Sequence, residues 1–298
     1  MTPEAGHSAI PLHGVRDQAV AALRRAGIPD PEVDADLLIG HVLKVGRGRV
    51  QALALAEVAL AETDAAAVVE LVSRRSRREP LQHITGRAPF RHLNLAVGPG
   101  VFVPRPETEQ VTQFAIDALA LVVVAPDDPD GPIAVDLGTG SGAIGLALAT
   151  EVPYARVYAV ENSPEALAWA TRNADETRAE NFSLVFADLA IALPELDGRV
   201  SVVVSNPPYI PMDCVPLDPE VWRYDPPVAL YGGADGLEVI RLLSRTALRL
   251  LRRGGTLVLE HGEEQGAAIR QLLTADGWHA AATHRDYTGR DRATTAVR

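Results

Sequence analysis

A short apolar run followed at once by a glycine-rich turn constrains this chain more than any other feature. Residues 133–137 read IAVDL, and they lead into DLGTGSGAIG, which holds four glycines in ten residues. Glycine lets the backbone turn tightly and approach a ligand closely. A helix that follows such a turn points its free N–H groups at that ligand. The segment therefore predicts a strand, a turn and a helix that together bind a nucleoside-type ligand.

Strand and helix patterns alternate through the rest of the chain. Further strand-like runs lie at 156–160, 183–186, 200–205 and 255–260, with two shorter ones near 278–283 and 293–297. Helical patterns lie between them at about 142–150, 163–175, 236–252 and 263–275. This alternation predicts an α/β fold in which helices cover both faces of a mostly parallel sheet. Before it, a helix is expected from Pro106 to about Leu121, and 125–132 should be a surface loop.

The first third of the chain has a different pattern. Apolar residues recur at helical spacing in 15–27, 31–43 and 62–78, with a linker between the second and third segments. Glycine and proline then punctuate short apolar runs from 80 to 104, which is typical of a hairpin. We therefore expect a helical domain over 1–80, a β-hairpin-like linker over 81–105 and the sheet domain over 106–298.

Composition and charge exclude several classes of protein. The net charge is −11, and almost all of it lies after residue 80, where 18 Lys and Arg face 28 Asp and Glu. Such acidity disfavours binding to bare nucleic acid, which needs a basic surface. Cys214 is the lone cysteine and the histidines lack ligand spacing, so neither a disulfide framework nor a metal is expected. Without a signal-like start or a long apolar run, the chain should be cytoplasmic, away from membranes and monomeric.

The glycine turn alone does not decide between two cofactors. Gly140, Gly142 and Gly145 fit the dinucleotide pattern G-x-G-x-x-G. Asp136 precedes them, however, and its carboxylate would repel a pyrophosphate, whereas S-adenosylmethionine is cationic and has no phosphate. The next two strands end near acidic residues, and Glu161 is placed for ribose hydroxyls and Asp188 for an adenine amino group. S-adenosylmethionine is therefore the expected cofactor.

The fourth strand delivers Asn206-Pro207-Pro208-Tyr209 to the same edge of the sheet. The two prolines stiffen the loop and lack N–H groups, so carbonyl oxygens dominate its polar surface. The Asn206 side-chain carbonyl and a backbone carbonyl can each accept one hydrogen of a substrate –NH₂ group, while Tyr209 offers a flat face. This loop predicts methyl transfer to a planar amide or amine nitrogen through alignment and electrostatics. The loop by itself leaves glutamine and adenine both open as acceptors.

With both loops in place, the chain resembles the HemK-type protein-(glutamine-N5) methyltransferases, which modify peptide chain release factors. The resemblance covers nearly the whole sequence, and its segments are EPLQHITG (79–86), VFVPRPETE (101–109), VDLGTGSGAIGLALA (135–149), SNPPYI (205–210), DPPVALYGGADGL (225–237) and LEHGEEQG (259–266). It implies a helical domain that docks the substrate, a hairpin linker and a class I, Rossmann-like methyltransferase domain. It also implies that the substrate is the glutamine of a Gly-Gly-Gln motif in release factors.

The same resemblance implies a set of site residues. Asn206 and Pro207 would hold the glutamine amide with Tyr209 and Phe102 beside it, and Asn206, Pro207 and Tyr209 would be the catalytic group. The substrate site would also include Pro208 and Arg105. The cofactor would be held by Asp136, Gly138, Thr139, Gly140, Ser141, Gly142, Glu161, Asp188, Leu189 and Asn206. Glu161 stands where aspartate is frequent in the family, and Leu189 where some members have an aromatic residue.

Several alternatives stay open at this point. A sister enzyme acting on a glutamine of a ribosomal protein would share the same chemistry, and a nucleic-acid adenine methyltransferase would flip a base against Tyr209. A non-catalytic, cofactor-binding regulator is a third alternative. Arg105 is either a substrate residue or a structural one that pairs with Glu107 or Glu109. The basic residues Arg74, Arg75, Arg77 and Arg78 are interpreted as a solvated helix end rather than a contact with a partner.

Overall fold

The computed structural model describes residues 10–123 and 131–298. Contacts divide the chain into two compact units, Met1–Gly86 and Arg87–Arg298. The start of the chain, where no signal peptide was expected, and most of the loop predicted at 125–132 lie outside the described residues. No helix within the described ranges has the length and apolar character needed to cross a bilayer.

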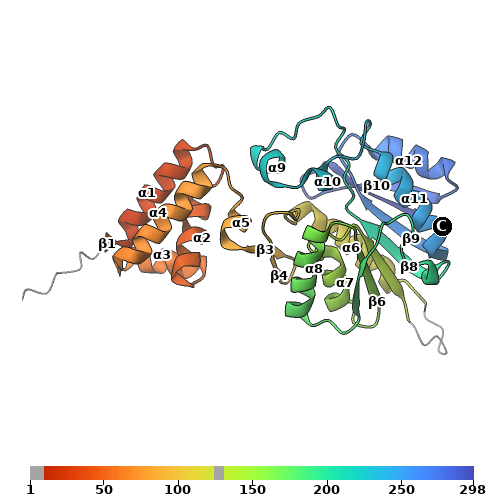
Figure 1. Ribbon diagram of the computed structural model, residues 1–298, viewed down its shortest axis with the longest axis horizontal. Coiled ribbons are helices and arrows are strands. Elements are labelled where there is room, and N and C mark those ends of the chain that lie inside the picture. Colours follow the sequence, from red (N-terminus) through yellow and green to blue (C-terminus); the bar gives the residue numbers. More distant parts are fainter. Residues whose placement is uncertain (1–9, 124–130) are drawn as a thin grey trace, which may run out of the picture. The chain divides into compact units, whose positions relative to one another are not determined.

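The N-terminal unit is built mainly from helices (Figure 1). Its four longer helices are α1 (Leu12–Arg25), α2 (Pro31–Leu43), α3 (Arg47–Leu55) and α4 (Glu62–Ser76). Helices α1, α2 and α4 confirm the periodic segments, but α3 lies where a linker was expected. Helix α3 was not predicted because it has no apolar stripe, since Val50 is the one fully buried position along it. Strands β1 (Ile10–Pro11) and β2 (Ala59–Leu60) pair as a two-residue ladder that the sequence did not indicate.

The boundary between the two units falls after Gly86, between a short helix and a hairpin. Helix α5 (Leu81–Thr85) lies where only hairpin-like structure was expected, and Gly86 ends it in a left-handed conformation at φ 70°. The hairpin itself is formed by β3 (Arg87–Phe90) and β4 (Leu93–Ala96).

The basic run at the end of α4 is not simply a solvated helix end. Arg75 is buried, and its Nε donates to Asp34 at 2.6 Å, while Arg74 pairs with Glu79. The solvated interpretation is therefore wrong for Arg75, because a buried guanidinium needs a carboxylate partner that the linear sequence does not reveal.

A seven-stranded sheet forms the centre of the second unit, in the order β10-β11-β9-β8-β5-β6-β7. Its strands are β5 (Ile133–Leu137), β6 (Arg156–Glu161), β7 (Phe182–Phe186), β8 (Val200–Ser205), β9 (Leu251–Glu260), β10 (His279–Arg285) and β11 (Asp291–Val297). The first five run parallel, and β11 pairs antiparallel with β9 and β10. The predicted strands and the predicted α/β class are confirmed.

Helices cover both faces of this sheet (Figure 1). The long helices are α6 (Pro106–Ala120), α7 (Ala143–Glu151), α8 (Pro164–Thr177), α11 (Glu238–Leu250) and α12 (Gly266–Ala275). Alternate residues of each central strand enter opposite cores. Val203 of β8 joins the core that includes α11 and α12, and its neighbour Val204 joins the core that includes α6 and α7. Three short helical segments, η1 (Pro194–Leu196), α9 (Pro219–Tyr224) and α10 (Pro227–Leu230), were not indicated by the sequence pattern.

The chain reverses its direction across the sheet at β5. From β5 it proceeds outward through β6 and β7, and then it returns to place β8 on the other side of β5. Loops that leave β5 and β8 therefore begin side by side at the carboxyl ends of the strands, where open α/β sheets bind ligands. The Ser205 hydroxyl joins the two strand ends by donating to the Leu137 carbonyl at 2.6 Å.

Candidate active site

A cavity of about 580 Å³ lies at this edge of the sheet. The predicted residues that line it are Phe102, Arg105, Gly138, Thr139, Gly140, Ser141, Glu161, Asp188, Leu189, Asn206, Pro208 and Tyr209. The fold thus brings the glycine turn after β5 and the Asn206 loop after β8 to one cavity, together with the segment before α6. Asp136, Gly142 and Pro207 were predicted in the same group but do not line the cavity.

Asp136 is buried beneath the glycine turn and holds it through hydrogen bonds. Its side chain has no exposed surface, and one oxygen, Oδ2, accepts from the Thr139 hydroxyl at 2.5 Å and from the Gly145 N–H at 2.9 Å. The other oxygen, Oδ1, has no hydrogen-bond partner among the described residues. Burial raises the pKa of Asp136 to about 7, and the Thr139 bond opposes that rise. The carboxylate therefore ties the turn to the first turn of α7.

The turn itself depends on left-handed backbone. Gly138, Gly140 and Gly142 have φ of 74°, 58° and 85°, which side chains other than glycine's rarely adopt. Gly142 caps α7. The carboxylate of Glu161 holds the turn from the next strand, because Oε2 accepts from the Gly140 N–H at 2.8 Å while Oε1 accepts from Asn162 and Ser163.

These residues fit a nucleoside cofactor. Glu161 ends β6 and lines the cavity, and Asp188, which is exposed, follows β7 beside it. Carboxylates accept hydrogen bonds from ribose hydroxyls and from an exocyclic amine. Leu189 lines the same wall and packs against the core that includes α11. Within the described part of the chain, no three His, Cys, Asp or Glu side chains converge as metal ligands.

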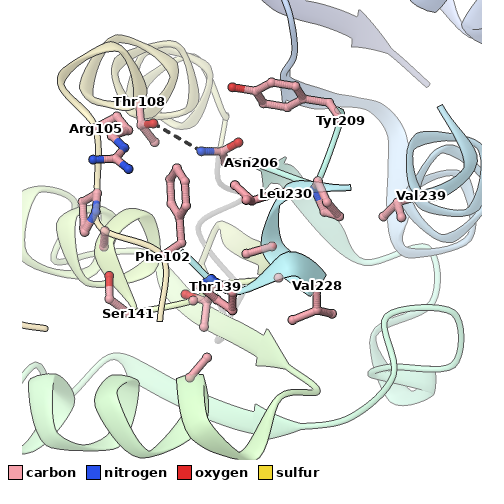
Figure 2. A pocket seen from close by; sticks show the side chains of 18 of the residues that line it. Phe102, Arg105, Thr108, Thr139, Ser141, Asn206, Tyr209, Val228, Leu230 and Val239 are labelled. Carbon is pink, nitrogen blue, oxygen red and sulfur yellow. Dashed lines mark hydrogen bonds between the residues drawn. The ribbon is translucent and has the colours of Figure 1, made fainter. Parts of the chain in front are cut away.

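Asn206 enters a hydrogen-bonded chain of buried groups. Its Nδ2 donates to the Thr108 hydroxyl at 3.3 Å, and that hydroxyl donates to Glu260 Oε2 at 2.7 Å. Figure 2 shows the Asn206 oxygen turned away from Thr108. Thr108 belongs to the first turn of α6, and Glu260 is the last residue of β9. Thr108 and Glu260 were not among the residues predicted from the sequence, although Glu260 ends a predicted strand at the ligand edge just as Glu161 does.

Two aromatic residues line the cavity, and a hydrogen bond from a glutamine holds the Asn206 loop. Tyr209 and Phe102 both line the cavity (Figure 2). Burial raises the pKa of the Tyr209 phenol, so the phenol is neutral. Gln265, the residue just before α12, holds the Asn206 loop in place, because its Nε2 donates to the Tyr209 carbonyl at 2.9 Å.

Arg105 pairs with neither of the partners expected for it. Its guanidinium donates to Asp225 and lies 4.9 Å from the centre of the Phe102 ring. The predicted pairing with Glu107 or Glu109 is wrong, since Glu109 instead accepts from the Arg91 N–H. The real partner lies 120 residues away in sequence, so only the folded chain brings the two together.

Comparisons with known proteins identify the family. A model of the PrmC N-terminal domain matches residues 15–86, and a model of the methyltransferase small domain matches residues 97–213. The release factor glutamine methyltransferase of Streptomyces coelicolor is 50% identical over 281 residues, which cover 94% of this chain and 95% of that protein. The chain belongs to the release factor glutamine methyltransferase family. The Bifidobacterium longum release factor glutamine methyltransferase is 45% identical, with 94% and 97% covered.

One relative carries a different name. The 4-amino-L-phenylalanine/4-methylamino-L-phenylalanine methyltransferase of Streptomyces pristinaespiralis is 41% identical, with 95% of this chain and 93% of that protein covered. Membership of the release factor glutamine methyltransferase family confirms the prediction of an S-adenosylmethionine-dependent methyltransferase. An enzyme named for an aromatic amine is thus also 41% identical to this chain. Sequence identity alone therefore does not identify the group that accepts the methyl, and the site has to be considered.

Proposed function

We propose that this protein methylates the side-chain amide nitrogen of the glutamine in the Gly-Gly-Gln motif of peptide chain release factors. The observation that carries the proposal is the orientation of the Asn206 amide, whose nitrogen faces Thr108 and whose oxygen is left for a ligand in the cavity. The names of the most similar relatives support a release factor as the substrate.

The site suits a weakly nucleophilic amide. The lone pair of an amide nitrogen is delocalised into its carbonyl, so the nitrogen must be oriented. Asn206 Oδ1 and a backbone carbonyl of the Asn206 loop would each accept one N–H hydrogen, and both would favour the positive charge that develops on the nitrogen. Phe102 and Tyr209 would lie beside the planar group. The nitrogen releases a proton only after it becomes cationic, so no strong base is needed.

The cofactor would lie on the glycine turn. Gly138 to Ser141, Glu161, Asp188 and Leu189 would hold it, with Asp136 and Gly142 supporting the turn from behind. S-adenosylmethionine supplies an electrophilic methyl group on a sulfonium. The protein contributes alignment, and well-aligned intramolecular reactions gain about 7–11 kcal/mol from such positioning. We also propose that residues 1–80 dock the release factor and that 81–105 link the two domains.

Labelled S-adenosylmethionine tests the acceptor directly. The protein is incubated with a release factor, with the same factor carrying asparagine for the motif glutamine, with a ribosomal protein, with DNA and with 4-amino-L-phenylalanine. Label should appear on the unmodified release factor alone. Label that persists on the asparagine variant, or that appears only on DNA or the aromatic amine, refutes the proposed acceptor.

The variant Asn206→Ala tests the proposed catalytic residue. It should lower kcat by about 10²–10³-fold, the loss typical of removing one group that stabilises transition-state charge. Cofactor affinity, measured by calorimetry with S-adenosylhomocysteine, should fall much less. Unchanged turnover in this variant would remove Asn206 from the mechanism.

A further inference from the structure

Thr108 and Glu260 are buried polar residues beside Asn206. They are 3% and 1% exposed, and no part of the methyl transfer proposed above requires either of them. Thr108 reaches the site from α6 and Glu260 from β9, so two separate elements place polar groups behind a single loop residue. Burying a carboxylate is costly unless it has hydrogen-bond partners, so its position here needs an explanation.

The direction of the hydrogen bonds supplies that explanation. An ionised carboxylate is an acceptor only, so the Thr108 hydroxyl must give its single proton to Glu260. The Thr108 oxygen can then only accept, and the Asn206 amide must therefore turn its NH₂ group toward it. The amide also bonds to Glu260 itself. A flipped amide would therefore place Oδ1 against the Thr108 and Glu260 oxygens with no proton between them.

We propose that Thr108 and Glu260 are positioning residues that lock the Asn206 side-chain amide in the orientation that presents Oδ1 to the substrate. This role rests on the proposed function of Asn206. Neither residue touches the reacting atoms in this arrangement, because both act through Asn206.

The protonation state of Glu260 makes this arrangement depend on pH. Burial raises the pKa of Glu260 to about 7, and the bond from Thr108 opposes that rise. Glu107 from α6 raises it further, Arg292 from β11 lowers it, and the neutral Tyr209 phenol also faces the carboxylate. A protonated Glu260 can donate to Thr108, and the freed Thr108 proton can then turn toward Asn206. The amide is no longer locked under those conditions.

Two substitutions at Thr108 separate this role from simple packing. Thr108→Val keeps the shape but removes the hydroxyl, and it should lower kcat about 10–100-fold, the scale of a misaligned reacting group. Thr108→Ser keeps the hydroxyl and should stay within about threefold of the wild type. Affinity for S-adenosylhomocysteine should be unchanged in both. Equal activity of the valine variant and the wild type overturns the proposal.

The pH profile of Glu260→Gln gives an independent readout. In the wild type, kcat should fall as the pH is lowered through about 7, because Glu260 gains a proton there. The glutamine variant has no such group, so this acidic fall should be absent whatever its basal rate. An acidic limb that survives unchanged in Glu260→Gln contradicts the proposed role of Glu260.

A measurement without substrate distinguishes failure of this proposal from failure of the proposed function. The chain has five asparagines, so selective ¹⁵N labelling gives few side-chain amide signals, and Asn206→Ala assigns one of them. In the wild type and in Thr108→Ser, the chemical shifts of the two Asn206 side-chain NH₂ protons should differ from those of a free amide. In Thr108→Val, these chemical shifts should move toward the free-amide values. Identical signals in all three proteins refute the lock, even if release factors prove not to be the substrate.

Discussion

Asp136 is a buried carboxylate whose replacement by asparagine should stabilise the protein. Both of its hydrogen bonds fall on one oxygen, from Thr139 and Gly145, while the other oxygen has no partner among the described residues. In Asp136→Asn, the amide oxygen can keep both bonds and the amide nitrogen takes the unpartnered position. The substitution thus removes a buried charge and leaves the hydrogen bonds in place.

The size of the effect follows from the pKa. Burial raises the pKa of Asp136 from 3.8 to about 7, and each unit corresponds to about 1.4 kcal/mol. Ionised Asp136 therefore costs the folded state about 4 kcal/mol relative to the unfolded chain. Because the folded pKa is the higher one, the protonated form stabilises the fold fully below 3.8, and this contribution is lost as the pH rises through about 7.

Urea unfolding of the wild type and Asp136→Asn at pH 4, 5.5 and 8 measures this difference. The two proteins should be nearly equal at pH 4, and the variant should gain progressively to about 4 kcal/mol at pH 8. Asp188→Asn, at an exposed carboxylate on the same edge, is the control and should change stability by less than about 0.5 kcal/mol. A variant no more stable than the wild type at pH 8, or a gain independent of pH, refutes the reasoning.

Two further substitutions test how the site is supported. Arg105→Met leaves Asp225 buried without its cation, and it should cost about 3 kcal/mol at pH 8 in chemical unfolding. Burial raises the pKa of Asp225 to about 6, so this penalty should shrink by pH 5, and a cost that does not depend on pH contradicts the pairing. Gly236→Ala places a Cβ 2.3 Å from the Tyr209 carbonyl at φ 73°, whereas Gly254→Ala at φ 76° meets nothing within 4 Å. Gly254→Ala should lose about 1–2 kcal/mol of stability from its left-handed backbone alone. Gly236→Ala should lose more because of the clash and should also lower kcat, and equal kcat values in the two variants would show that the clash is absorbed away from Tyr209.

Much of the sheet domain could be predicted because its strands are short apolar runs between helices of ordinary length. Residues 133–137 and 200–205 became β5 and β8 within the predicted bounds. Helix α3 could not be predicted in the same way, since a helix with one fully buried position leaves no periodic trace. The segment 81–85 was also missed, because five residues are too few to show a helical period.

The sequence by itself determined which loops lie together at the ligand-binding edge of the sheet. Parallel strands end at a common edge, so the glycine turn after β5 and the Asn206 loop after β8 had to lie together once the alternation was recognised. Only the tertiary structure decided how these groups are held. Thr108 and Glu260 lie 98 and 54 residues from Asn206 along the chain, and Arg105 lies 120 residues from Asp225. The physical reason is that a buried polar group takes whichever partner the packing of distant elements brings within hydrogen-bonding distance, and local sequence patterns do not contain that information.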